Sequence, residues 1–198
     1  MRDRNLRLTQ IRLEDAEKKI SNPSFWSKKG LGNDIGYYVF DYPPEDELIV
    51  RDWLQYIQGR SKSKTSEFKL TVFDLYDIMI DMLEENDFLD LCFEMEKKDG
   101  VERITKAVSR TLGLSDDEGL IVKHIKEKIQ EDTVILLAGV GKCYPILRAH
   151  KILNNLHQML VNAPVVMLYP GKYGEKSLTL FNNDEEDNFY WVKRLVKN

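Results

Sequence analysis

The chain has 198 residues, of which 42% are hydrophobic, so it can bury one substantial core, and we expect a single domain over residues 1–198. A net charge of −4 argues against nucleic-acid backbone binding as the main activity, and we expect no direct nucleic-acid binding. The two cysteines are too few for a disulfide framework, and no apolar run approaches the ~18 residues of a membrane helix, so we expect a cytoplasmic protein that does not enter a membrane.

The N-terminal part predicts two helices and two strands. The first helix covers about residues 5–20 and carries charges of both signs beside an apolar side. The second follows Pro44, and its core face is expected to consist of Leu48, Ile49, Trp53, Leu54 and Ile57. Residues 36–40 and 68–73 are rich in aromatic and β-branched side chains, which is typical of strands. Each strand ends in the tripeptide Val-Phe-Asp, at Asp41 and at Asp74. We interpret these two carboxylates as caps of the helices that follow, in preference to a paired-carboxylate site.

Residues of about 75–130 predict a helical insertion between the second and third strands, with four helices. This is more helix than an ordinary crossover needs, and Ser115–Glu118 forms a capping box that starts the last of the four. Acidic residues recur in the first part, without the alternating ligand order of a calcium loop, so a solvated face is favoured over a metal site. They are Asp77, Asp81, Glu84, Glu85, Asp87 and Asp90.

The stretch from Thr133 to Tyr173 predicts a βαβ unit, around which the fold is organised. An apolar run at 133–139 and another at 164–169 are typical of buried parallel strands. Between them an apolar helical face runs to Leu160, and Pro145 is expected as the first residue of that helix. Pro170-Gly171 is expected to stop the second strand.

A glycine turn, Gly139-Val140-Gly141, follows the first of these strands, at the edge where open α/β sheets bind ligands. It is not a P-loop, because Leu136 and Cys143 replace the required glycine and hydroxyl residue. Nor is it a dinucleotide fingerprint, because Tyr144 replaces the third glycine. A tight strand-to-helix turn is favoured, and a turn that holds a phosphate without hydrolysis stays open as the alternative.

The C-terminal part predicts an edge strand at 177–181, an acidic loop at 182–188 and a closing helix at 189–196. The link from the strand at 164–169 is too short for a parallel crossover, so the edge strand should be antiparallel. The predicted fold class is therefore α/β: a mainly parallel central sheet of about five strands flanked by helices, with an antiparallel edge strand.

No catalytic set is recognisable, so we expect a protein that is not an enzyme and holds no metal and no cofactor. His150 and His157 are two helical turns, or about 10 Å, apart, which is too far for one metal ion. Cys143 is the best candidate nucleophile, since a nearby helix N-terminus would lower its pKa, but a buried packing residue is favoured. Asn154 and Asn155, in mid-helix, indicate a hydrogen-bonding role, either towards the loop at Tyr169 or towards a partner.

From about Asn22 to the C-terminus, the order and spacing of motifs resemble the BrxB family, a component of the BREX bacteriophage-exclusion systems. The motifs in the C-terminal half are Gly139-Val140-Gly141, Tyr144-Pro145, Arg148, His150, Leu153-Asn154-Asn155-Leu156, Pro164, Tyr169-Pro170-Gly171, Tyr173, Ser177-Leu178, Leu180-Phe181, Asp187-Asn188 and Tyr190. Those in the N-terminal half are Gly32-Asn33, Phe40-Asp41-Tyr42-Pro43 and Glu47-Leu48.

The resemblance implies a non-catalytic scaffolding subunit that works beside the alkaline-phosphatase-like protein PglZ, the DNA methyltransferase PglX and a large ATPase. Such systems methylate host DNA and block the replication of incoming phage. The family-like motif residues that we take as candidate binding residues are Asp41, Tyr42, Gly139, Gly141, Tyr144, Arg148, His150, Asn154, Asn155, Tyr169, Gly171 and Tyr173.

Overall fold

The computed structural model describes residues 2–26, 36–113, 119–130, 132–158, 163–174, 177–181, 184–186 and 192–197. The chain groups into two compact units. The first is formed by Met1–Val72, Ile129–Leu137 and Asn162–Asn198, and the second by Phe73–Lys128 and Ala138–Val161. That the two units form one domain, as the sequence analysis expects, stays a prediction.

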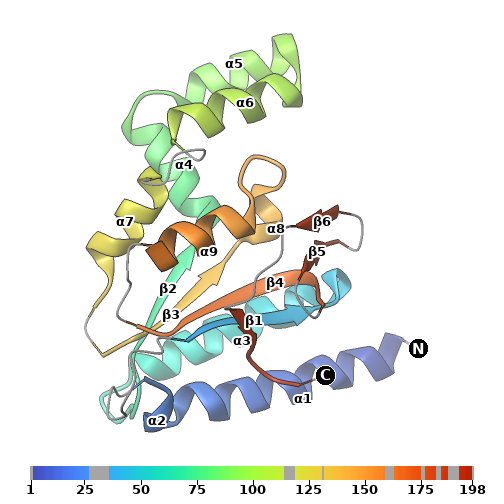
Figure 1. Ribbon diagram of the computed structural model, residues 1–198, viewed down its shortest axis with the longest axis vertical. Helices are drawn as coiled ribbons and strands as arrows, with labels where there is room; N and C mark the ends of the chain where they lie inside the picture. Colours follow the sequence, from blue (N-terminus) through green and yellow to red (C-terminus); the bar gives the residue numbers. More distant parts are fainter. Residues whose placement is uncertain are drawn as a thin grey trace. The chain divides into compact units, whose positions relative to one another are not determined.

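The first unit is built on the predicted parallel sheet (Figure 1). Its strand order is β2-β3-β4-β1-β7, and parallel pairing joins β3 to β4, β4 to β1 and β1 to β7. The strands are β1 (Tyr37–Tyr42), β2 (Leu70–Asp74), β3 (Val134–Ala138), β4 (Val165–Tyr173) and β7 (Val192–Arg194). Every side chain of β3 is buried, as its unbroken apolar run predicts. The α/β fold class and the parallel 133–139 and 164–169 strands are thus confirmed.

Strand β4 continues through Pro170 and Gly171 and does not stop there, which corrects one prediction. Up to Pro170 it pairs with β1, and from Gly171 to Tyr173 it pairs antiparallel with β5 (Leu178–Leu180). Glycine is needed at the change of partner, because a Cβ at Gly171 would overlap the carbonyl oxygen of Thr179 on β5. The antiparallel edge strand is confirmed, and part of the expected acidic loop is a further strand, β6 (Asp184–Glu186), paired with β5.

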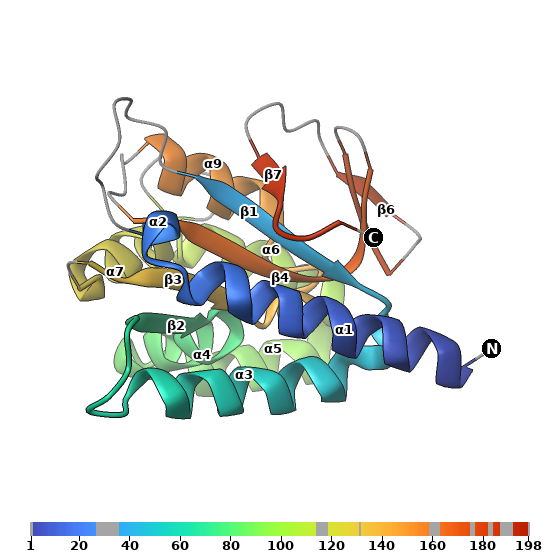
Figure 2. The same cartoon turned by 90° about the horizontal axis from the view of Figure 1, so that it is seen from below.

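Helices α1 (Arg2–Ser21) and α3 (Glu47–Ser61) lie side by side along one face of this sheet (Figure 2). Both have apolar residues at helical spacing towards the core, and α3 buries Val50, Trp53 and Ile57. Leu48, which the sequence places on the core face of α3, is 71% exposed, because it lies on the opposite side of the helix from Val50. Two short segments complete this region, α2 (Pro23–Trp26) and the 3-10 turn η1 (Pro44–Asp46).

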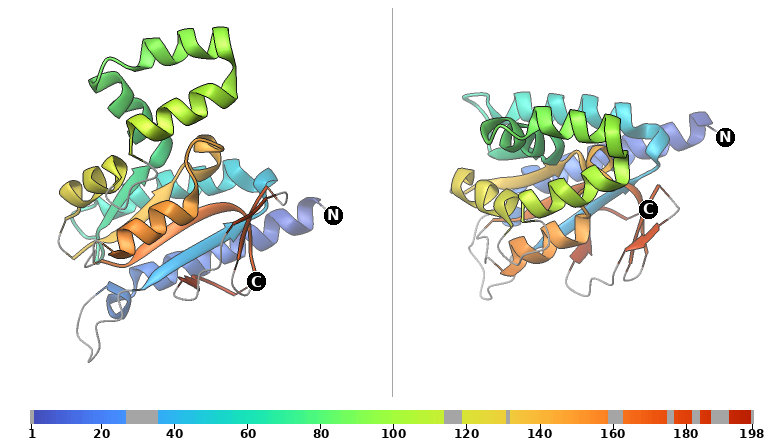
Figure 3. Two further views of the ribbon diagram at one scale, coloured as in Figure 1. Left: turned by 45° about the horizontal axis from the view of Figure 1, so that its top comes forward. Right: turned by 90° about the horizontal axis from the view of Figure 1, so that it is seen from above.

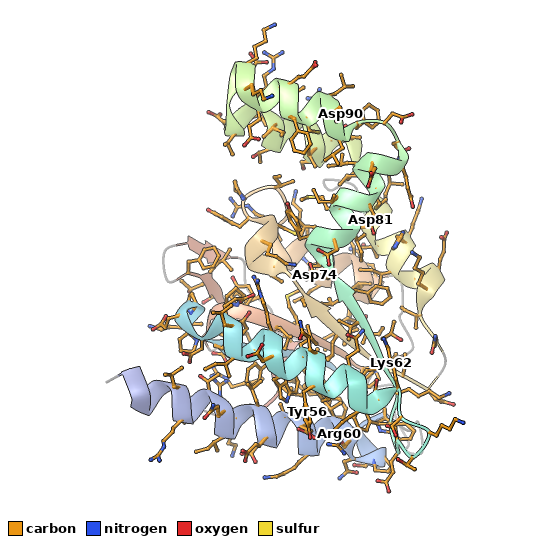
Figure 4. The ribbon with its side chains drawn as sticks, turned by 180° about the vertical axis from the view of Figure 1, so that it is seen from behind. Tyr56, Arg60, Lys62, Asp74, Asp81 and Asp90 are labelled. Atoms are coloured by element: carbon orange, nitrogen blue, oxygen red, sulfur yellow. The ribbon has the colours of Figure 1, made fainter. Side chains whose placement is uncertain are left out.

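The second unit contains the predicted insertion, whose four helices lie between β2 and β3 in the chain. They are α4 (Leu75–Glu85), α5 (Leu89–Asp99), α6 (Val101–Thr111) and α7 (Leu120–Lys128). The recurrent acidic residues are all exposed, as a solvated face requires, and Figure 4 labels Asp81 and Asp90 among them. The capping box at 115–118 lies outside the described residues.

The crossover between β3 and β4 is split into α8 (Val140–Cys143) and α9 (Ala149–Gln158), which corrects the prediction of one helix from Pro145. Helix α8 ends at Cys143, and Tyr144 has an extended backbone followed by a cis peptide bond to Pro145. Pro145 therefore belongs to the turn between the helices. The apolar face of α9 is confirmed by its buried residues Ala149, Ile152, Leu153 and Leu156, and Leu160 lies outside the described residues.

The closing helix expected at 189–196 is wrong, because Val192–Arg194 forms β7 beside β1. The alternation of buried Val192 with exposed Lys193 suits a strand at a sheet edge. Leu195 is buried. Residues 187–191 lie outside the described part of the chain. No helix among the described residues is long and apolar enough to cross a membrane.

Candidate functional site

Asp41, on β1, is the centre of a buried ion-pair network in the first unit. Its side chain is almost fully buried, and Oδ1 accepts a 2.7 Å hydrogen bond from Nη2 of Arg12 on α1. Nη1 of Arg12 donates to the Asp41 carbonyl oxygen at 2.7 Å. Oδ2 lies 3.2 Å from Nη1 of Arg194 on β7 and accepts from the Tyr173 N–H at 3.1 Å. One carboxylate thus joins four segments: α1, β1, β4 and β7.

Asp41 does not cap a helix, which corrects the sequence prediction. The residues that begin η1 and α3 are Pro43 and Asp46, and neither gives a side-chain cap. The reason is that Asp41 still belongs to β1, whose pairing with β4 runs to Tyr42, so its carboxylate points from the sheet and not from a helix start.

The sequence analysis missed Arg12, although a signal for it was present. Thr9, Arg12 and Ala16 lie on one helical stripe by their i, i+3, i+4 spacing, so two polar residues fall on the buried side of α1. The Thr9 hydroxyl donates to Oδ2 of buried Asp46 at 2.6 Å. Polar residues on an otherwise apolar helix face predict buried hydrogen-bond partners, here the carboxylates of Asp41 and Asp46.

Two tyrosines of the motif set, Tyr173 and Tyr42, join segments of the first unit by hydrogen bonds. The Tyr173 hydroxyl donates to the Val192 carbonyl at 2.6 Å, and its ring lies 5.6 Å from the Arg194 guanidinium, which also donates to the Tyr173 carbonyl. The Tyr42 hydroxyl donates to Oε2 of Glu47 at 2.5 Å. Burial raises the pKa of both phenols. Tyr169 is fully buried in β4.

The glycine turn belongs to the second unit and packs against the start of α4. Gly139 has φ +80°, and a Cβ there would overlap Oδ1 of Asp74. Asp74 accepts from the backbone N–H groups of Tyr76 at 3.0 Å and Asp77 at 3.4 Å, which confirms its predicted capping role (Figure 4). Its Oδ2 also lies 2.5 Å from Nζ of Lys142. The turn is therefore fixed by a carboxylate and its paired lysine.

The electrostatics of this turn are unfavourable for an anion and for a thiolate. Lys142, the cation of the turn, is bound to Asp74 and lies 3.5 Å from Oδ1 of Asp77. Cys143 is fully buried, and burial, together with the nearby Asp74 charge, raises the pKa of its thiol to about 12. The expected lowering by a helix N-terminus is not found, because Cys143 is the last residue of α8 and desolvation dominates. This supports Cys143 as a packing residue.

The remaining motif residues surround the start of α9. Arg148, which precedes the helix, and Asn154 are exposed, whereas Asn155 is buried at 8% exposure. Tyr144 and His150 are half-buried, and Gly141 lies in α8. A role for Asn155 inside the fold fits its burial, but the tie from α9 to the loop at Tyr169 stays a prediction.

The motif residues are divided between the two units. Asp41, Tyr42, Tyr169, Gly171 and Tyr173 belong to the first unit, and the others belong to the second. Among the described residues, no group of three or more His, Cys, Asp or Glu side chains is arranged to hold a metal ion. Gly32, Asn33, Asp187, Asn188 and Tyr190 lie outside the described residues.

Comparison with known proteins places these motifs in a family. The family model described as BREX protein BrxB matches residues 71–195. The chain belongs to the BrxB family. It is 40% identical over 191 residues to BREX protein BrxB of Bacillus cereus (strain H3081.97), covering 96% of this chain and 99% of that protein. It is 29% identical over 187 residues to BREX protein BrxB of Escherichia coli O9:H4 (strain HS), covering 94% and 91% of the two chains.

The resemblance to BrxB is therefore confirmed, and it places the chain among the proteins of BREX, the bacteriophage-exclusion system. The matched range 71–195 includes the whole second unit and the motif residues of β4, whereas the BrxB motif around Asp41 precedes it. No solved structure matches the chain.

Proposed function

We propose that this BrxB-family protein is a non-catalytic, scaffolding subunit of its BREX system. It binds the alkaline-phosphatase-like protein PglZ and, through PglZ, works with the PglX methyltransferase and other BREX subunits in host DNA methylation and phage exclusion. It acts in the cytoplasm without contacting nucleic acid directly. Family membership supports the system, and one feature of the second unit supports the binding role.

That feature is the α5–α6 hairpin, formed by residues 89–111. Its two helices of 11 residues each pack against one another, and each buries a single side chain, Cys92 in α5 and Val108 in α6. Helix α4, also of 11 residues, buries five. A helix in a protein gains most of its stability from a packed apolar face, so a hairpin with so little buried side chain indicates a surface that a partner completes.

The hairpin and the loop before it also carry exposed large apolar side chains. Phe88, Leu91, Phe93 and Val101 are between 40% and 54% exposed. Single exposed apolar residues are ordinary on a protein surface, but several large ones on a short hairpin are typical of binding surfaces. Aromatic residues are enriched in protein–protein interfaces. We therefore assign the α5–α6 hairpin to the contact with PglZ.

The non-catalytic part of the proposal is supported by the chemistry of the glycine turn. Leu136 and Cys143 stand where a P-loop has its glycine and its magnesium-binding hydroxyl, and Lys142 is paired with Asp74. The purified protein should release no phosphate from ATP or GTP above the buffer rate. Turnover that disappears in Lys142→Ala would overturn this assignment.

The alternative function is a degenerate nucleotide-binding domain that holds a phosphate at Gly139–Gly141 without hydrolysis. The Asp74 carboxylate next to Gly139 disfavours it, because a bound phosphate would meet a like charge at close range. Helix α8 is also too short to offer the dipole of a full helix. The binding role is therefore preferred.

Co-purification with PglZ tests the proposal. Affinity-tagged PglZ from the same system should retain the folded, monodisperse protein at micromolar concentration. PglX should be recovered with this protein only when PglZ is present. Loss of retention with both proteins folded would reject PglZ as the partner, and direct recovery of PglX without PglZ would reject the order of assembly.

A further inference from the structure

A cavity of about 810 Å³ opens within the second unit. Its walls come from α6, which is one helix of the hairpin, and from α7, the turn after α8 and the first part of α9, which Figure 3 draws in yellow to orange. Its volume is typical of sites for small molecules. None of its lining residues belongs to the network around Asp41 or to the Gly139 turn.

Four basic side chains reach this cavity from two different walls. Lys106 and Arg110 come from α6, and Arg148 and Lys151 come from the start of α9. Within the described part of the chain, the one acidic residue that lines the cavity is Glu102, whose Oε1 lies 2.8 Å from Nζ of Lys106. Among the described residues, no carboxylate lies within ion-pair distance of Arg110, Arg148 or Lys151. Three cations around one cavity, without a carboxylate partner in the described part of the chain, favour a bound anion.

Two further features of the walls suit an anionic oxygen ligand. Arg148 immediately precedes the first residue of α9, a helix of 10 residues, whose first backbone N–H groups have no partner within the helix and lie at the positive end of its dipole. The side chains of Ser109 and Asn155 also line the cavity and are of types that can donate hydrogen bonds, whereas the Thr105 hydroxyl donates to the Val101 carbonyl at 2.8 Å. Phosphate groups bind well where a helix N-terminus and arginine side chains meet.

The rest of the lining is apolar and aliphatic. Ile121, Val122, Leu147 and Ile152 are buried and form part of the wall. None of the described residues that line the cavity is aromatic. A strand of nucleic acid normally stacks its bases on aromatic side chains, so this lining favours a small molecule over single-stranded DNA.

We propose that this cavity binds a small phosphate-bearing molecule, with Arg110, Arg148 and Lys151 as the charged contacts and the aliphatic wall against its uncharged part. The site shares Val101 and the α6 wall with the hairpin to which PglZ is assigned, whereas Phe88, Leu91 and Phe93 do not line it. It gives Arg148, an exposed residue of the family motif, a direct role in binding.

Isothermal titration of the full-length protein with inorganic pyrophosphate, and separately with ATP without magnesium, tests the proposal. The wild-type protein should bind at least one of the two, more weakly as salt is raised. Arg148→Gln and Lys151→Gln should each weaken that binding by roughly tenfold or more, because each removes a charge-assisted hydrogen bond. Tighter binding of pyrophosphate would indicate that the cavity recognises only the phosphate groups of its ligand. Tighter binding of ATP would indicate that it also contacts an organic part.

The matched control is Lys126→Gln with Lys128→Gln, on α7 but outside the cavity lining. It removes two positive charges from the same unit and should leave the affinity unchanged. The acidic stretch at 115–118, which lies outside the described residues, is kept unchanged in every variant. Thermal melts verify that each variant is folded.

Four results would overturn the proposal. The first is no heat of binding at millimolar pyrophosphate or ATP. The second is an affinity that falls equally in the control, which would indicate attraction by net charge. The third is binding of ATP that survives Arg148→Gln and is lost in Lys142→Ala, which would locate the phosphate at the Gly139 turn. Binding to single-stranded DNA but to neither small ligand would also reject it.

Discussion

The Asp41 carboxylate links four segments of the first unit: α1, β1, β4 and β7. It neutralises Arg12, which is itself buried, and receives Arg194 from the last described strand. A buried pair contributes little compared with an apolar replacement of both partners, but losing one partner leaves the other charge uncompensated. The motif residue Asp41 is therefore explained by folding of the unit.

Asp41→Asn should lower the free energy of unfolding by about 3–5 kcal/mol, because the Arg12 guanidinium would stay buried without its counter-charge. Urea denaturation measures the change. Asp15→Asn, which removes an exposed carboxylate paired with Lys18, should change it by less than about 0.5 kcal/mol. In the double variant with Arg12→Gln, the loss should be smaller than the sum of the two single losses. A stability of Asp41→Asn within 1 kcal/mol of wild type, roughly the value of one ordinary hydrogen bond, would contradict this role.

Cys143 predicts a stability loss at alkaline pH. Burial raises the pKa of its thiol from 9.0 to about 12. Below pH 9 the thiol is protonated in both the folded and the unfolded state, so its contribution to stability is fully present. Above pH 9 the unfolded chain loses the thiol proton, whereas the folded protein keeps it. Stability therefore falls as pH rises from about 9 towards 12.

The urea midpoint should decline over this range, and less steeply in Cys143→Ala than in wild type. The variant will be less stable at neutral pH, since it loses a buried sulfur, so the slope and not the midpoint is compared. The buried phenol of Tyr37, whose pKa is raised to about 12, adds to the decline in both proteins. Equal slopes would show that Cys143 ionises alike in the two states.

At the scale of elements, the sequence predicted which helices and strands form better than it predicted where each begins and ends. The strands at 133–139 and 164–169 were predictable, because unbroken apolar runs between glycine and proline residues have few other readings. Pro170-Gly171 signalled a stop, but the structure uses it for a change of pairing partner from β1 to β5. That contact, Gly171 against Thr179, is made across the sheet and has no local signal.

Two other errors have the same physical origin. Residues 189–196 have apolar residues that fit a helical face as well as a strand, and only pairing with β1 decides for β7. Pro145 suits a helix start by its missing N–H, but the earlier end of α8 puts it in a turn. Strand pairing and turn geometry thus determined the secondary structure of residues whose local sequence fits more than one conformation.

Helix α9 offers a direct test of the predicted apolar face. Leu153 is fully buried, whereas its neighbour Asn154 is exposed. Leu153→Asp should abolish the cooperative thermal transition, because an unpaired charge would enter the core. Asn154→Asp adds the same charge on the outer face of the helix and should stay within about 0.5 kcal/mol of wild type by urea denaturation. Equal behaviour of the two variants would mean that α9 does not present the face described.

At the scale of the whole molecule, the parallel sheet and the helical insertion were predictable from periodicity, and family membership from the order of the motifs. The partition into two units was not, because it depends on which contacts the chain makes after folding. Nor was the weak burial of the α5–α6 hairpin, since its sequence has apolar residues enough for an ordinary packed pair. The sequence motifs identified the family, whereas the exposed apolar surface of the α5–α6 hairpin was found only in the structure.

The affinity for PglZ of a Leu91→Asp, Phe93→Asp variant tests the central claim most directly. Both side chains are exposed on α5, so the variant should keep the wild-type melting temperature, and truncation of interface anchors of this kind typically weakens binding by at least tenfold. Ile11→Asp with Leu48→Asp, on α1 and α3 of the first unit, changes two residues that are at least as exposed and is the matched control. We predict that titration calorimetry finds micromolar or tighter binding for wild type and control and at least tenfold weaker binding for the hairpin variant. Wild-type affinity in the hairpin variant, or no PglZ binding by the folded wild-type protein, would contradict the account.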